Sequence, residues 1–291
     1  MKLHSPIATC LCFYRIRLAA VVVLLMVLGA PAKAQEVDGA EILSGNAVEG
    51  GLIIARTDPA NQIMLDDDAI EIGENGVFVI GFHRDSDVTV TLRIIAPDGS
   101  VKTSRLSPRQ RNYNIQRIDG LKSTMVTPPA SVLARIKSDG DAVRTARQRE
   151  APLGDFWRGF DWPALGQISG IYGSQRILNG QPRQPHYGID IAAPTGTPVY
   201  APASGLVTLV KDLYFSGWTV VIAHGLGVNS SFLHFDRVDV ETGMVIERGG
   251  LIGKIGATGR ATGPHLDWRI DWQGRRIDPG LLVGAMPDPA T

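Results

Sequence analysis

Apolar and polar residues alternate over short runs through the first part of the chain. Between residues 51 and 121, segments such as GLIIARTD and DVTVTLRII are of strand length and are separated by Gly, Pro, Asn and Asp. A period of two is typical of strands buried on one face, and these turn residues end strands. We therefore expect a small antiparallel β-sandwich at residues 51–121, after a flexible polar lead-in at residues 35–50.

The period changes between residues 127 and 150, where apolar residues return every three or four positions. Two prolines followed by Ser131 are typical of a helix start, whereas Gly140 weakens the middle of the pattern. The aromatic segment GDFWRGFDWP at 154–163 is interpreted as packing against the domain that follows. We expect a helical linker over residues 122–163.

From residue 164 onward the strand pattern returns and is closely punctuated by glycine. WTVVIAHG, GGLIGKIGAT and PHLDWRI are examples, and no segment has a convincing helical period. Dense glycine between short strands favours a compact, curled sheet with tight corners. The fold class predicted is therefore all-β, with a C-terminal Gly-rich β-sheet domain at 164–291 preceded by the β-sandwich and the linker helix.

The first 34 residues have the pattern of a secretory signal peptide. Lys2, Arg15 and Arg17 precede the apolar run LAAVVVLLMVLGA, and small residues follow up to Ala34. The run is too short to span a bilayer comfortably, although an N-terminal membrane anchor is the alternative. No other long apolar run occurs, so we expect cleavage after Ala34 and no stable membrane span afterwards.

Composition narrows the choice of compartment and partner. The chain has 291 residues and a formal net charge of zero, and the leader removes four positive and no acidic residues, which leaves −4. This charge and the absence of a long basic run give no indication of a nucleic-acid partner. Both cysteines, Cys10 and Cys12, lie in the leader, so the mature chain has no disulfide and no thiol nucleophile. Export without disulfides suits a bacterial envelope protein.

Histidines concentrate in the C-terminal region, where four of the six fall between residues 186 and 265. In HYGID, His186, Gly188 and Asp190 share parity and therefore face the same side of an extended segment. A bend near Gly188 would let both polar side chains reach one ion, and glycine permits that bend at low cost. Imidazole and carboxylate are both ordinary zinc ligands.

A second segment repeats this arrangement. His265 and Asp267 lie two apart in PHLDWRI and therefore face the same way, with apolar residues between them. His234 in FLHF offers a third polar strand face, so the three segments can converge on one groove. His224 precedes a glycine at a strand end, which favours a hairpin or supporting role. Arg269, behind the motif, is interpreted as surface charge.

Three blocks taken together carry a resemblance to a known family. HYGIDIAAPTGTPVYAPASGLV, SSFLHF and GATGRATGPHLDWRI follow one another in the order and spacing of the lysostaphin-type (LytM-like) zinc endopeptidases of peptidoglycan. The segment 164–282 resembles this family, which implies a metallopeptidase domain with the duplicated hybrid motif fold. The flanking glycines match as well.

The resemblance implies a role for each polar residue of the motif. His186 and Asp190 match two zinc ligands, and His234 and His265 match the two histidines that assist the reaction without binding the metal. The family's third ligand is the second His of His-x-His, and Asp267 stands at that position here. Either the Asp267 carboxylate binds zinc and makes the site more anionic, or zinc is lost and the groove only binds. We favour zinc at the site, because the other four residues are present.

A function follows from the resemblance. It implies a zinc metalloendopeptidase that hydrolyses peptide cross-links or stem peptides of bacterial peptidoglycan. The segments 174–185 and 211–218 are expected to wall the groove, and Tyr187, Tyr214 and Trp218 are candidate substrate contacts. Together with the leader, this places the protein in the periplasm or envelope of a Gram-negative-type bacterium.

Two other functions remain open. One is a catalytically degenerate LytM-like domain that binds the cell wall or activates a wall amidase, in which case the amidase or another regulatory protein is a partner. The other is a metal-free carbohydrate-binding domain, which leaves the polar cluster unexplained.

Overall fold

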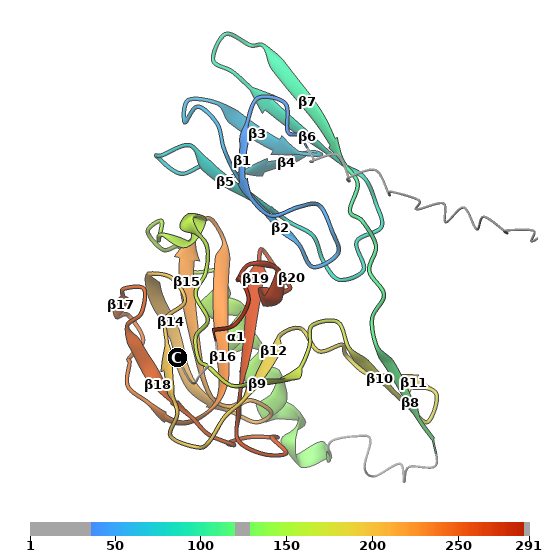
Figure 1. The fold of residues 1–291 in the computed structure, drawn as a ribbon, viewed down its shortest axis with the longest axis vertical. Helices are drawn as coiled ribbons and strands as arrows, with labels where there is room; N and C mark the ends of the chain where they lie inside the picture. The colour runs from blue at the N-terminus through green and yellow to red at the C-terminus, as the bar shows by residue number, and fades with distance from the viewer. Residues whose placement is uncertain (1–35, 120–128, 288–291) are drawn as a thin grey trace, which may run out of the picture. The chain divides into compact units, whose positions relative to one another are not determined.

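The computed structural model describes residues 36–119 and 129–287, and almost all regular structure in these ranges is β-strand (Figure 1). The predicted all-β class is confirmed. The predicted signal peptide at 1–34 and the start of the predicted linker lie outside the described residues. No helix within the described ranges has the length and apolar character needed to cross a membrane.

Two antiparallel sheets form the N-terminal region. One has the order β1-β2-β5 and the other the order β4-β3-β6-β7. Their strands are β1 (Glu41–Ser44), β2 (Leu52–Arg56), β3 (Gln62–Leu65), β4 (Asp68–Ile70), β5 (Val77–Gly81), β6 (Val90–Ile95) and β7 (Val101–Leu106). The lead-in at 35–50 is thus not entirely flexible, because β1 lies inside it and Ile42 pairs with Ala55 of β2. Sequence reasoning missed β1 because its four residues, with adjacent Ile42 and Leu43, are too few to show an alternating pattern.

The linker contains α1 (Leu133–Arg147), which follows the short 3-10 turn η2 (Ala130–Val132). The helix buries part of the predicted apolar pattern together with one carboxylate. Leu133 is 51% exposed and Ile136 and Val143 are half-buried, whereas Ala146 and Asp139 are buried. The helix packs against β14 and β15 of the large sheet, and a carboxylate in that interface provides polar rather than apolar contacts.

The aromatic segment after α1 packs as predicted. It includes the 3-10 turn η3 (Phe156–Arg158), and both Phe156 and Phe160 are buried. The Phe160 ring makes an edge contact with His224 at 5.5 Å between centroids. Through these rings the linker becomes part of the hydrophobic core that the large sheet builds.

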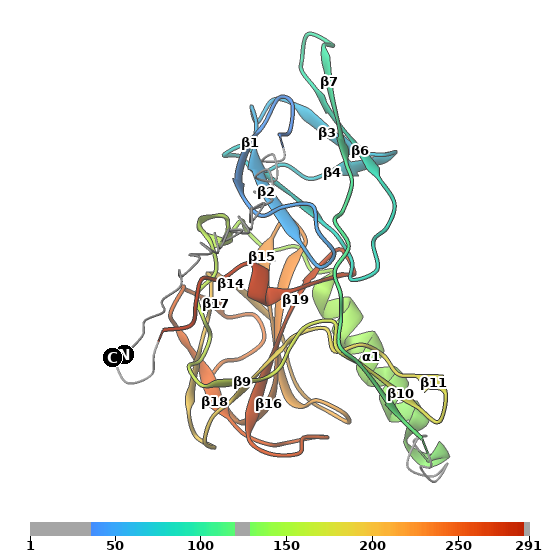
Figure 2. The same ribbon diagram turned by 45° about the vertical axis from the view of Figure 1, so that its right-hand side comes forward.

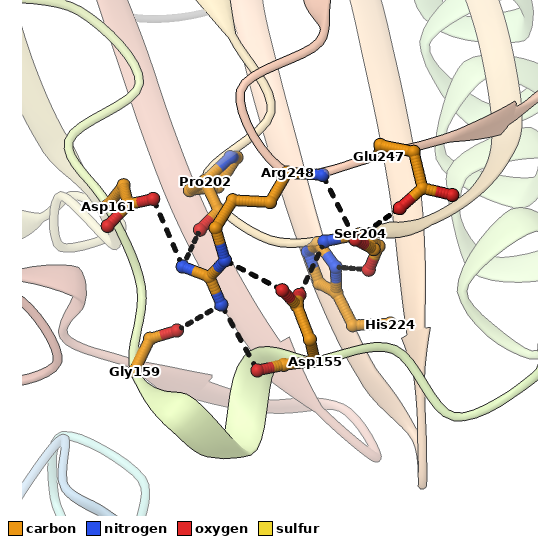
Figure 3. Close-up of polar contacts among 8 residues, drawn as sticks. All are labelled: Asp155, Gly159, Asp161, Pro202, Ser204, His224, Glu247 and Arg248. Atoms are coloured by element: carbon orange, nitrogen blue, oxygen red, sulfur yellow. Dashed lines mark hydrogen bonds and ion pairs between the residues drawn. The ribbon is translucent and has the colours of Figure 1, made fainter.

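Arg248 fixes the same segment by polar contacts (Figure 3). Its guanidinium donates to Asp155 Oδ2 at 2.7 Å and to Asp161 Oδ2 at 3.1 Å. It also donates to the backbone carbonyls of Asp155, Gly159 and Pro202. One arginine thus satisfies acceptors on both sides of η3, in the planar fork geometry that guanidinium favours.

The large C-terminal sheet has ten strands with the path β17-β14-β15-β16-β19-β12-β9, and β13, β18 and β20 join at its sides (Figures 1 and 2). The strands are β9 (Gln167–Gly170), β12 (Ile189–Ala192), β13 (Pro198–Tyr200), β14 (Gly205–Leu213), β15 (Gly217–Gly225), β16 (Val228–Val238), β17 (Val245–Ile246), β18 (Leu251–Ile255), β19 (His265–Trp272) and β20 (Arg275–Ile277). The chain then enters the 3-10 turn η4 (Pro279–Leu281).

A small hairpin lies outside this sheet and pairs with a strand that precedes α1. It consists of β10 (Gln175–Leu178) and β11 (Gln181–Pro182). The strand β8 (Ile115–Ile118), which comes before α1, pairs with β10 in parallel over four residue pairs. One edge of the hairpin is therefore filled by a strand from the N-terminal part of the chain.

Candidate metal centre and groove

Strand β19 separates apolar from polar residues strictly by parity. Its even-numbered members are fully buried in the core: Leu266, Trp268, Ile270 and Trp272. Its odd-numbered members line a groove on the other face: His265, Asp267, Arg269 and Asp271. Since successive side chains of a strand point to opposite faces, the buried Leu and Trp residues determine which way the polar residues point.

Register brings two carboxylates together. Strand β12 runs antiparallel to β19, and Asp190 lies directly opposite Asp267 in the pairing. Like charges opposite each other across a ladder are destabilising unless a cation lies near both. The arrangement therefore favours binding of a positive charge between the two strands.

Gly188 allows a third donor to approach. The chain bends at Gly188 just before β12, which brings His186 Nε2 to 3.2 Å from Asp190 Oδ1. A Cβ at Gly188 would lie only 2.7 Å from Asp267 Oδ1 and 2.5 Å from the backbone carbonyl of Trp268. Only glycine fits this close approach of the two segments, as the bend inferred from the sequence requires.

The three donors form a set that can hold a divalent ion. One atom from each of His186, Asp190 and Asp267 lies within 4.8 Å of the other two. His186 Nε2 and Asp190 Oδ1 are both buried, and although they lie 3.2 Å apart, neither makes a hydrogen bond of good geometry with any described residue. Buried polar atoms are seldom left unsatisfied, and an imidazole with carboxylates is a zinc-type donor set. The residues present therefore fit a zinc ion.

The electrostatics of His186 agree with this. Burial alone would lower the pKa of His186, but the neighbouring Asp190 carboxylate and the charge of Asp267 raise it above its ordinary value. The site therefore stabilises positive charge near the His186 ring.

Two further histidines border the donor set, with their rings 4.7 Å apart. His234 Nδ1 lies 2.8 Å from the Thr258 carbonyl, and His265 Nδ1 lies 2.9 Å from the Gly263 carbonyl. A carbonyl can only accept, so each Nδ1 carries the proton and each Nε2 is the acceptor nitrogen of the neutral ring. His265 Nε2 is 3.9 Å from Asp190 Oδ1.

His234 has an unusual backbone conformation. Its φ is +69°, in the left-handed region, where the ladder between β16 and its neighbours is irregular. A non-glycine residue there is uncommon and often marks a functional site. Burial lowers the pKa of His234, which keeps the ring neutral and available as a base.

Arg269 is a site residue that the sequence interpretation missed. It is not simply a surface charge, because its Nε donates to Asp267 Oδ1 at 2.9 Å and to Oδ2 at 3.1 Å, and its Nη2 also donates to Oδ2. Burial alone would raise the pKa of Asp267, but the Arg269 guanidinium holds it below its usual range. The i,i+2 spacing on one strand face was the available signal.

The groove has a volume of about 2130 Å³, and both predicted wall segments contribute to its lining. Tyr214 lines it, whereas Tyr187 and Trp218 are not among its lining residues. Tyr187 instead packs its ring 5.4 Å from the ring of His83. The reason is parity, because Tyr187 follows His186 and points to the opposite face. Trp218 shares parity with the buried Val220 and Ile222 of β15, whereas Thr219 and Ala223 of that strand line the groove.

Helix α1 also borders the groove, which the linker interpretation did not foresee. Ile136, Asp139 and Arg147 of this helix are among the lining residues. Asp139 accepts a hydrogen bond from the Tyr214 backbone NH at 2.8 Å and lies 3.5 Å from Lys211 Nζ. The helix therefore braces the wall at 211–218.

His224 has the supporting role that its position suggested. The ring is fully buried, with Nδ1 2.9 Å from the Ser204 carbonyl (Figure 3). Its Nε2 lies 2.9 Å from Ser230 Oγ. Burial lowers the pKa of His224 to about 4. The neutral ring thus ties two strands together inside the core.

Together, the fold and the donor set define a β-domain with a candidate divalent-metal centre. Residues 184–279 match the model of peptidase family M23. The structure is similar to a putative M23 peptidase from Pseudomonas aeruginosa, with a TM-score of 0.66 and 30% sequence identity over 84% of this chain and 97% of that chain. The chain belongs to peptidase family M23.

Curated relatives match over the same region. Peptidoglycan DD-endopeptidase ShyA of Vibrio cholerae is 36% identical over 141 residues, which is 48% of this chain and 30% of that protein. DD-carboxypeptidase/endopeptidase Mpg of Neisseria meningitidis is 41% identical over 105 residues, 36% of this chain and 24% of that protein. The chain thus spans less than a third of the length of each of these relatives.

Proposed function

We propose that this protein is a zinc metalloendopeptidase that hydrolyses peptide cross-links of bacterial peptidoglycan. One observation carries the proposal: donor atoms of His186, Asp190 and Asp267 lie within 4.8 Å of one another in the groove. Membership of peptidase family M23 and the names of the relatives, DD-endopeptidases of peptidoglycan, support it.

Zinc would be held by His186 Nε2 and by one carboxylate oxygen each of Asp190 and Asp267. When bound, the ion supplies Lewis-acid polarisation of the scissile carbonyl and a more acidic water. Asp190 and His186 come from one segment and Asp267 from the opposed strand. The pleat and the bend at Gly188 thus hold the three donors in place before any ligand arrives.

His265 and His234 supply the proton chemistry. In both rings Nδ1 is fixed on a backbone carbonyl, which orients the acceptor Nε2. A neutral Nε2 accepts the proton of the attacking water, and the protonated ring then donates a hydrogen bond to the developing oxyanion. His265 is the nearer of the two to the donor set, at 3.9 Å from Asp190 Oδ1.

The groove suits an extended peptide held between the hairpin β10–β11 and the loop at 211–218. We propose a D,D cross-link as the substrate class, in line with the names of the relatives. With the predicted signal peptide, the place of action is the periplasm or cell envelope of a Gram-negative-type bacterium. A wall amidase or a regulatory protein is the proposed class of partner.

The test uses the mature chain without the predicted signal peptide. Zinc content is measured on the purified protein, and release of muropeptides from peptidoglycan is followed with and without a chelator. We expect about one zinc per chain, release that the chelator abolishes, and loss of both in Asp267→Ala. Metal-free protein that leaves peptidoglycan intact after zinc is added contradicts the proposal.

A second candidate is a catalytically degenerate wall-binding domain. The engagement of Asp267 by Arg269 favours it, because two lone-pair positions of the carboxylate are already used. This candidate predicts that the metal-free protein binds peptidoglycan without cleaving it.

A further inference from the structure

We propose that Arg269 is the positioning residue that allows Asp267 to stand where an imidazole would otherwise complete the metal centre. The proposal rests on the proposed function, since it concerns the same donor set. Arg269 would act through Asp267 and would not touch the ion or the substrate.

The contact geometry supports the pairing. Arg269 lies two positions after Asp267 on β19 and points to the same face. Its guanidinium engages both carboxylate oxygens, through Nε and Nη2. Asp267 has 5% of its side chain exposed, so almost no water competes with the guanidinium for these oxygens. Such a pair fixes the orientation of the carboxylate and leaves its remaining lone pairs directed toward His186 and Asp190.

Charge balance supports it as well. Zinc sites built from two neutral imidazoles and one carboxylate carry a net charge of −1 before the metal enters. The set His186, Asp190 and Asp267 carries −2, and Arg269 returns the total to −1. The ion would thus meet the same local charge as in a two-imidazole site, which bears directly on its Lewis acidity.

The carboxylates of Asp190 and Asp267 differ in their ion-pair partners. Among the described residues, the ion pairs of Asp190 involve only the histidines His186 and His265. The guanidinium of Arg269 is paired with Asp267 and not with Asp190. The cation therefore accompanies the carboxylate that occupies the third ligand position.

The test is a double-mutant cycle on the mature chain: wild type, Asp267→His, Arg269→Met and the double variant. For each, the zinc dissociation constant is measured by competition with a chelator, and the d–d absorption is recorded after Co²⁺ loading. We expect each single variant to bind zinc about 10–100-fold more weakly, because the first leaves a guanidinium facing an imidazole and a cation, and the second leaves the carboxylate unsupported. The double variant should bind within a few-fold of wild type and give a tetrahedral Co²⁺ spectrum.

Arg276→Met is the matched control. Arg276 is also an arginine paired with an aspartate, Asp271 of the same strand, but that aspartate is not one of the three donors. Zinc affinity should be unchanged in this variant. Equal losses for Asp267→His with and without Arg269 would overturn the proposal, as would full affinity in Arg269→Met. Wild-type protein that binds no zinc would instead refute the proposed function itself, so the two failures are distinguishable.

Discussion

Three histidine rings share one hydrogen-bonding arrangement at Nδ1, and they differ in what surrounds Nε2. His224, His234 and His265 each place Nδ1 on a backbone carbonyl. In His224 the Nε2 is paired with Ser230 inside the core. His234 and His265 border the groove instead. A fixed tautomer thus holds strands together at His224, and in the proposed mechanism it prepares the other two rings for proton transfer.

His224 makes the stability of the fold depend on pH. Its pKa is about 4 in the folded chain and about 6.5 in the unfolded chain, so the unfolded chain takes up the proton first as the pH falls. This contribution is fully present above pH 6.5 and declines toward pH 4, by about 3 kcal/mol in total.

The measurement is urea denaturation between pH 7.5 and pH 4 for wild type and His224→Gln. We expect the wild type to lose more stability than the variant over this range, because glutamine does not titrate. If the free energy of unfolding depends on pH in the same way in both proteins, the pKa of His224 is not lowered by folding, which contradicts this prediction.

Replacement of the two groove histidines should separate chemistry from metal binding. His234→Asn and His265→Asn are expected to retain zinc and to lower kcat/KM for cross-linked muropeptides by about 10²–10⁴-fold, since each removes a proton acceptor. Asparagine tolerates the left-handed backbone at position 234, so the fold should persist. Loss of zinc in either variant would reassign that histidine to the ligand set.

At the scale of elements, parity explains most of what the sequence could predict. The alternation in PHLDWRI identified the two faces of β19, and HYGID showed that His186 and Asp190 share a face with a bend between them. If both segments belong to one sheet, their polar faces lie on the same side of it, and this is why the sequence predicted that they converge. These features depend on the alternation of side chains and on the position of glycine. Both are visible in the sequence without knowledge of which strands pair.

Other features could not be predicted because they depend on long-range partners. Nothing in the residues of β8 indicates that it pairs in parallel with β10, far along the chain. Spacing places Arg269 on the same face of β19 as Asp267, but it does not determine whether the guanidinium turns toward that carboxylate or toward solvent. The apolar pattern of α1 likewise gave no indication that the helix buries Asp139, because that burial depends on contacts made by the 211–214 segment.

Asp139 provides a test of how α1 supports the groove. Asp139→Asn weakens its ion pairs with Lys211 and Arg135 and disturbs the bond to the Tyr214 backbone NH. We expect a loss of about 1–3 kcal/mol in stability, faster hydrogen exchange at Tyr214 and a lower kcat/KM with unchanged zinc content.

Asp141→Asn on the same helix is the control for this prediction. In the described part of the chain, Asp141 pairs only with Lys137 and Arg144, which both lie within α1. It should leave the exchange at Tyr214 and the activity unchanged. If both variants behave alike, the helix affects the wall only through its own stability.

At the scale of the whole molecule, the segment before residue 164 is built into the C-terminal domain. Phe156 and Phe160 lie in its core, and Arg248 holds the backbone around η3 (Figure 3). The boundary that composition suggested at residue 164 therefore cuts through packed structure, because rings that look like a linker in sequence fill the interior.

Arg248→Met in the mature chain tests this connection. It removes one donor each from two carboxylates and three carbonyls, and we expect a loss of about 2–4 kcal/mol in stability with faster proteolysis between residues 151 and 163. Arg158→Met, at an exposed arginine of the same segment, should change neither quantity. Zinc content should be the same in both variants, because neither arginine lies near the donor set. Equal sensitivity of the two variants to protease would argue against the role of Arg248.

The pairing of β8 with β10 and the contact of α1 with the 211–214 segment have a consequence for how such a protein diversifies. Both flanks of the opening are held by stretches of chain that carry none of the histidines or donor carboxylates. Mutations in those stretches can widen or narrow the opening while the reactive groups keep their positions. If the proposed function holds, preference for one peptide fragment over another can thus change independently of the reaction performed on it.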